Sequence, residues 1–242
     1  MNTLMFFYTL AILVICIVTA VLSLAAYASS RRRFFIYGSG VFICYAIEMT
    51  EIFFFECTLQ NQSFPASDYY SIAMPVMRTL VATASQAFIW LIAMDLLDKH
   101  SKKLFAIPVL TFLLCESLII VAVPSGPMCQ WVYYTMRQVF LAFVGLYIFW
   151  TAYKSTKVEL KARVNNQRKH LIIGTILVGC IVAEDFYNIL IVPMSLAPSW
   201  LQLYLSERNF SENVFACYFA ILLIIYSYHV LSIRMQEAPE EK

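Results

Sequence analysis

The sequence contains little charge and few histidines. Only 13% of its 242 residues are charged and 61% are hydrophobic, whereas a soluble domain carries about 25% charged residues. So little charge cannot cover a water-facing surface, and we expect lipid to cover much of the chain. The three histidines are scattered, and no CxxC or HExxH spacing occurs. We therefore expect no metal site and no cofactor. Because no nucleophile–base constellation is visible, we expect no enzyme.

Cysteine is more frequent, with seven residues. Five of them fall inside apolar runs, where small core residues are the ordinary interpretation: Cys16, Cys44, Cys115, Cys180 and Cys217. Cys57 and Cys129 lie at the outer ends of predicted helices. They could form a disulfide in an oxidising compartment, although a sequence alone does not establish a pairing.

Long apolar runs are the main feature that is present. Each has close to the roughly 20 residues that a helix needs to cross a bilayer, and all are too long and continuous for barrel strands. The first run exceeds the apolar core of a cleavable signal peptide and lacks a basic leader. We predict an all-α integral membrane protein, a seven-helix bundle over residues 1–235 with a tail at 236–242. The expected helices are about 4–27, 34–55, 72–96, 104–123, 130–153, 170–193 and 212–234.

The basic residues predict the orientation of these helices. Of 17 lysines and arginines, 14 lie in the first, third and fifth loops or after the last helix. Cytoplasmic loops carry such an excess of positive charge. The N-terminus is therefore predicted outside and the C-terminus in the cytoplasm, in a multi-pass protein of the cell (plasma) membrane.

Two predicted helices share scarce residues at a constant shift. Displacing the second by 136 residues onto the sixth pairs Arg32 with Arg168, Gly38 with Gly174, Cys44 with Cys180 and Glu48 with Glu184. We hypothesise a 3+1+3 parallel repeat, with the fourth helix as linker. Symmetry-related positions of this kind line ligand sites in transporters.

Ionisable and polar groups inside the predicted helices are the candidate site. With the orientation above they all fall in the outer half of the membrane. An isolated charge at mid-bilayer costs at least about 2.5–3.5 kcal/mol, so these groups must face inward. The candidate ligand-binding residues are Glu48, Glu51, Arg78, Glu116, Arg137, Glu184, Asp185 and Asn188. Further polar groups on the same helices are Ser85, Gln86 and Gln138.

Two interpretations of these groups remain open. Each arginine could be a structural clamp, neutralised by a glutamate on a neighbouring helix. Alternatively, the groups line a ligand pocket, because five acids face two arginines and the surplus acids must be protonated or meet a cation. The second interpretation favours a ligand with an amine, and the arginines would receive a carboxylate if the ligand has one.

Short motifs along the chain resemble a known family. The segments that carry the resemblance are 45–49 (YAIEM), 88–95 (FIWLIAMD), 104–108 (LFAIP), 167–169 (QRK) and 185–188 (DFYN). They are similar to the bacterial seven-transmembrane sensory regions at the N-termini of histidine kinases, diguanylate cyclases and membrane-bound transcription regulators. The resemblance implies a sensor whose output lies in a cytoplasmic signalling domain or a partner protein, because only a short tail follows the last predicted helix.

We therefore expect a membrane-embedded receptor that binds a small extracellular ligand in an outer-leaflet polar cavity. Its partners would be the bilayer, that ligand and a cytoplasmic signalling component; a homodimer is left open, and no nucleic-acid contact is expected. The alternative is a small secondary transporter that uses the same acids as coupling sites. A transporter needs a polar route through the inner half of the membrane, and the sequence supplies little there beyond His229.

Overall fold

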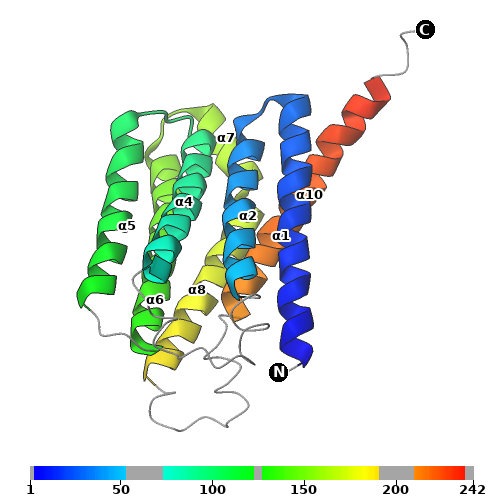
Figure 1. Cartoon of the computed structure of the whole chain (residues 1–242). Coiled ribbons are helices and arrows are strands. Elements are labelled where there is room, and N and C mark those ends of the chain that lie inside the picture. Colours follow the sequence, from blue (N-terminus) through cyan, green and yellow to red (C-terminus); the bar gives the residue numbers. More distant parts are fainter. Residues whose placement is uncertain (1–2, 53–72, 123–126, 191–209, 238–242) are drawn as a thin grey trace. The chain divides into compact units, whose positions relative to one another are not determined.

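The computed structural model describes residues 3–52, 73–122, 127–190 and 210–237 (Figure 1). Within these ranges all regular secondary structure is helical, which confirms the all-α prediction for the described chain. The helices are α1 (Thr3–Ser30), α2 (Arg33–Ile52), α4 (Ala73–Leu96), α5 (Lys102–Ala122), α6 (Pro127–Lys154), α7 (Val158–Asn166), α8 (Arg168–Leu190) and α10 (Phe210–Glu237).

Four helices are long and apolar enough to cross a membrane within the described residues. The qualifying stretches are Phe7–Ser30, Thr79–Leu96, Met136–Lys154 and Asn213–Gln236. A helix overlaps each of the seven predicted segments. The number of seven spans and the outside position of the N-terminus remain predictions.

One helix was not expected. Residues 154–169 were expected to form a loop, but α7 occupies Val158–Asn166. Leu160 and Val164 are four residues apart, so they share a face of this helix, and both are buried. A short apolar pair inside a strongly basic segment was too weak a signal to predict a helix.

The chain divides into two compact units. The first contains residues 1–95 and 217–242, and the second contains residues 96–216. The last helix, α10, thus belongs mostly with α1, α2 and α4 rather than with α6 and α8. This grouping differs from the two three-helix halves of the repeat hypothesis.

Small residues let the helices of the first unit approach closely. Ser39 of α2 donates a hydrogen bond to the Ala20 carbonyl of α1 over 3.0 Å. On α10, the Leu223 side chain approaches Gly38 so closely that a Cβ built there would lie 2.7 Å from its Cδ2. Phe42 of α2 also stacks on Phe219 of α10, with ring centroids 5.7 Å apart.

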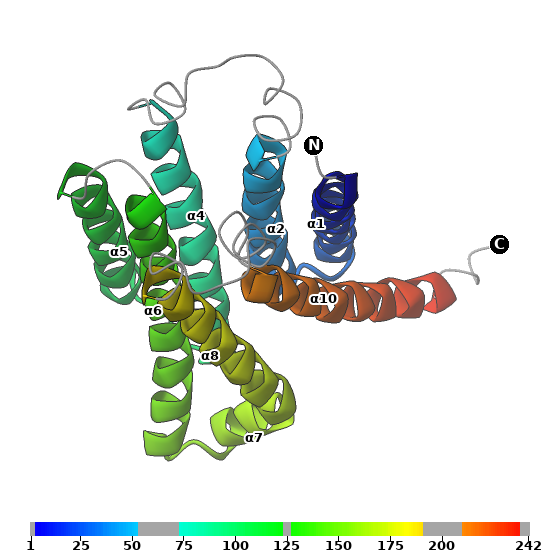
Figure 2. The same cartoon turned by 90° about the horizontal axis from the view of Figure 1, so that it is seen from below.

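The second unit is built around α6. Phe140 of α6 meets Phe112 of α5 edge to face, with ring centroids 5.2 Å apart. Helix α7 lies between the end of α6 and the start of α8 (Figure 2). The Arg163 side chain of α7 donates a hydrogen bond to the Leu96 carbonyl over 3.4 Å. This contact ties α7 to the last residue of α4.

Candidate functional site

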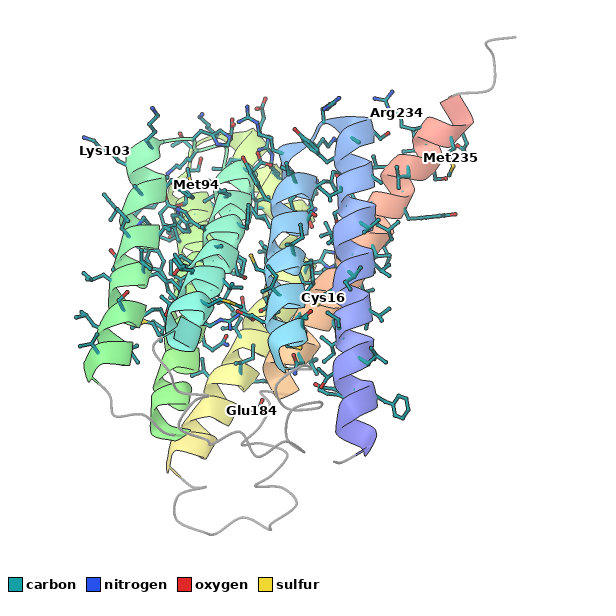
Figure 3. All side chains as sticks on the ribbon, viewed as in Figure 1. Cys16, Met94, Lys103, Glu184, Arg234 and Met235 are labelled. Carbon is teal, nitrogen blue, oxygen red and sulfur yellow. The ribbon has the colours of Figure 1, made fainter. Side chains whose placement is uncertain are left out.

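The predicted site residues are spread over both units. Glu48 is on α2 of the first unit, and Glu116, Arg137 and Glu184 are on α5, α6 and α8 of the second. Figure 3 marks Glu184 on α8. The remaining predicted side chains lie outside the described residues, although their backbones are helical: Glu51, Arg78, Asp185 and Asn188. Of the candidate disulfide, Cys57 and the side chain of Cys129 also lie outside the described residues.

The register of α5 against α6 places two predicted residues at one level. Phe112 and Phe140 are in contact, and the chain runs in opposite directions along the two helices (Figure 1). Glu116 is four residues after Phe112, and Arg137 is three residues before Phe140. Both spacings keep the side chains on the contacting faces. Glu116 and Arg137 therefore meet, and they interact electrostatically.

We use the name α5–α6 polar cluster for Glu116, Arg137 and Gln138, the residue that follows Arg137 on α6. Glu116 and Gln138 are fully buried, and Arg137 is 2% exposed. Within the described chain, neither carboxylate oxygen of Glu116 and neither amide atom of Gln138 has a hydrogen-bond partner. The interaction of Glu116 with Arg137 is therefore not a hydrogen-bonded ion pair. Leaving a buried polar group unsatisfied costs about 1–3 kcal/mol, and more if it is charged.

Below this cluster the α5–α6 contact becomes apolar. From Arg137 towards the end of α6, the buried side chains over the next three turns are Phe140, Leu141, Val144 and Ile148. The facing buried residue of α5 is Phe112. The polar and apolar parts of the contact are thus separated along the helix axis.

Helix α4 of the first unit likewise has a buried polar part followed by a buried apolar part. Thr79, Thr83 and Gln86 follow one another at helical spacing and are buried. The two hydroxyls and the Gln86 amide have no hydrogen-bond partner among the described residues. Further along α4, Trp90 and Ala93 are buried on the same face. The indole N–H of Trp90 is the one polar group in these two side chains.

Thr79 and Thr83 of α4, like the buried Ser23, Ser85 and Ser227, differ from six other hydroxyl residues of the described chain. A helical Ser or Thr commonly bonds the carbonyl four residues earlier. Such bonds are made by Thr19, Ser30, Thr50, Thr111, Ser117 and Thr175. Thr79 and Thr83 are buried and do not satisfy themselves in this way.

Glu48 has a different environment from Glu116. It is half-buried and interacts electrostatically with Cys16 of α1, which also interacts with Cys217 of α10. Cys16 is buried, and the described cysteines are free thiols. Figure 3 marks Cys16 on α1. No group of three or more His, Cys, Asp or Glu that could hold a metal ion occurs in the described part of the chain.

The structure thus brings together Glu116 and Arg137 of the predicted residues. Gln138, the third member of the cluster, was recognised in the sequence only as a further polar helix residue. The sequence feature that could have indicated Gln138 is its position next to Arg137, near the start of an apolar run. Glu48 and Glu184 fall in separate units.

Comparison with known proteins gave no relationship: no family model, curated protein or solved structure matches the chain.

Proposed function

We propose that this protein is a receptor of the cell membrane that binds a small polar ligand at the α5–α6 polar cluster and signals to the cytoplasm. The observation that carries the proposal is the unsatisfied, buried set of Glu116 and Gln138 beside Arg137. In an apolar membrane interior such groups require partners. A bound polar molecule would supply them.

The chemistry of the cluster indicates the class of ligand. Glu116 can accept hydrogen bonds from an amine, Arg137 can donate to a carboxylate, and the Gln138 amide can do both. Arginine is well suited to a carboxylate because its planar guanidinium donates two parallel hydrogen bonds. We therefore propose a small molecule with an amine, and with a carboxylate to engage Arg137. An amino acid fits this description.

The apolar contacts below the cluster favour a receptor over a transporter. A transported polar molecule would have to pass the level of Phe112, Phe140, Leu141 and Val144 in the second unit. These buried side chains offer it no hydrogen bond. In the proposed orientation this apolar level faces the cytoplasm. A ligand held above it can still act by shifting the population of two helix arrangements.

Helix α6 supplies a route for such a signal. It carries Arg137 and Gln138 near one end of its described side chains, and α7 follows its other end. Leu160 and Val164 of α7 are buried, so a tilt of α6 would displace α7. The proposed output is a cytoplasmic signalling domain or partner protein, as the resemblance to bacterial seven-transmembrane sensory regions implies.

The test uses the full chain in lipid nanodiscs and measures thermal unfolding with the standard amino acids and simple aliphatic amines. A ligand at one hundred times its Kd adds about 2.7 kcal/mol of stability, which raises the Tm by about 5–10 °C for a chain of this size. We expect such a shift in the unchanged protein and not in Glu116→Gln or Gln138→Leu. Glu159→Gln is the matched control, because it removes an exposed carboxylate of α7.

Two results would overturn the proposal. Equal ligand stabilisation in the unchanged protein, Glu116→Gln and Gln138→Leu would remove the cluster from the site. Net accumulation of a radiolabelled amino acid in vesicles containing the unchanged protein would convert the receptor into a transporter.

A further inference from the structure

A dense group of cations occupies one end of the second unit. We call this surface the basic end and define it as residues 98–103 and 154–169. It contains nine lysines and arginines and only two acids, Asp98 and Glu159. All nine cationic residues are exposed: Lys99, Lys102, Lys103, Lys154, Lys157, Lys161, Arg163, Arg168 and Lys169.

The fold, and not the sequence alone, gathers these residues. Helix α5 starts at Lys102, α6 ends at Lys154 and α8 starts at Arg168, and these three helix ends lie at the same end of the unit (Figure 1). Figure 3 shows Lys103 projecting from the start of α5. The hydrogen bond from Arg163 to the carbonyl of Leu96, the last residue of α4, holds α7 beside the start of the 97–101 connection to α5. The cations of two separate loops therefore form one surface.

Aromatic side chains on α6 place this surface relative to a membrane. Trp150 is 58% exposed and Tyr153 is 80% exposed. The Lys154 ammonium lies over the Trp150 ring, 4.2 Å from its centroid. Tryptophan and tyrosine gather at the headgroup level of a bilayer, and a lysine at a helix end extends its ammonium towards the headgroups. The cations that follow Trp150 therefore lie at the level of lipid phosphates.

Helix α7 presents mainly polar side chains outward, and Val158 at its start is its one exposed large hydrophobic residue. Its buried residues, Leu160 and Val164, already pack within the protein. Lys157 and Lys161 are exposed. Within the described part of the chain, neither ammonium group donates a hydrogen bond to a carboxylate. An amphipathic helix that has used its apolar face in this way has no need to insert into lipid. It offers charge to the membrane surface instead.

We propose that the basic end binds the headgroups of anionic phospholipids in the leaflet that surrounds this end of the helices. The partner is a lipid and not an acidic protein, because the cations continue directly from membrane-interface aromatics on the same helix. Each lysine or arginine near an anionic leaflet increases the binding constant for that leaflet about five-fold. It falls steeply when salt shortens the Debye length.

Trp150 provides a local probe of the lipid. Lipids with brominated acyl chains quench tryptophan fluorescence on contact, and the chain contains four tryptophans. The Trp150 signal is the difference between the unchanged chain and Trp150→Phe. The experiment titrates detergent-solubilised protein with brominated phosphatidylglycerol, which is anionic, or brominated phosphatidylcholine, which is zwitterionic. Inorganic phosphate is added as a competitor in a third series.

We expect phosphatidylglycerol to quench Trp150 at a concentration at least five-fold lower than phosphatidylcholine. The preference should disappear in 1 M salt and in a variant with Lys102, Lys103, Lys157 and Lys161 changed to glutamine. Glu159→Gln removes an acid from the same surface and should strengthen the preference. This second variant keeps the test decisive if the four-lysine variant does not fold.

Three results would overturn the proposal. One is equal quenching by both lipids in the unchanged protein, which would leave an acidic protein as the partner of this surface. Another is an undiminished preference in the four-lysine variant. The third is complete displacement of phosphatidylglycerol by millimolar inorganic phosphate, which would show a site for the free anion and not for a membrane surface.

Discussion

Replacing Gly40 by alanine should destabilise the protein, although alanine is the better helix former. Gly40 lies in α2, where a Cβ would stand 2.7 Å from Cε1, Cε2 and Cζ of Phe88 on α4. Carbon atoms in apolar contact prefer about 3.5–4.0 Å, so the ring would have to retreat by about 1 Å. Rotation of the ring about its own axis gives no relief, because that axis passes through Cζ.

The same substitution at Gly145 of α6 is the matched control. No heavy atom lies within 4 Å of the Cβ position there. Both changes gain up to about 1 kcal/mol from helix propensity, so this gain cancels in the comparison. Overpacking costs about 1–3 kcal/mol. The Tm of Gly40→Ala should therefore lie about 2–12 °C below that of Gly145→Ala.

Thermal unfolding of both variants in one detergent measures this difference. Combining Gly40→Ala with Phe88→Leu should recover much of the lost stability, because leucine lacks the ring edge that faces α2. Phe88→Leu alone is the reference for that double variant. Equal Tm values for the two glycine variants would refute the close approach of α2 and α4 at this point.

Further predictions concern the topology, the polar cluster and α7. Cysteines introduced at Ser101 and Ser155 should react with a membrane-impermeant maleimide only from the cytoplasmic side, and labelling from outside would reverse the orientation. A double-mutant cycle of Glu116→Gln and Arg137→Met should give a coupling of about 0.5–3 kcal/mol, and additive effects would mean that their electrostatic contact is without consequence. Leu160→Ala should cost about 2 kcal/mol or more and speed amide exchange in α7, whereas exposed Ala162→Ser should not.

The helices were largely predictable because a segment that could span a membrane is recognised by its length and apolar composition. Their grouping was not predictable from the sequence. On α10, for example, Leu223 is buried while Ile221 and Ile225 are exposed, and all three are equally apolar. In a lipid environment both sides of such a helix are hydrophobic, so no contrast between apolar and polar faces reveals which side meets another helix.

The candidate site was predictable in part for the opposite reason. A glutamate or arginine inside an apolar run is conspicuous, and so Glu116 and Arg137 stood out. Their meeting depends on the register of α5 against α6, which the contact of Phe112 with Phe140 sets. That contact could not be chosen from 19 phenylalanines by sequence alone.

The position of the Phe112–Phe140 contact gives the α5–α6 pair unequal lever arms. At 1.5 Å per residue, Glu116 lies about 6 Å from Phe112 along α5, while Lys102 lies about 15 Å away on the other side. On α6 the corresponding distances from Phe140 are about 4.5 Å to Arg137 and about 21 Å to Lys154. If the two helices pivot at the phenylalanines, a displacement at the polar cluster is magnified about two- to five-fold at the basic end. A hydrogen bond can shorten by about half an ångström. With the pivot so near the polar cluster, a shift of that size there becomes a movement of about one to two ångströms among the exposed cations.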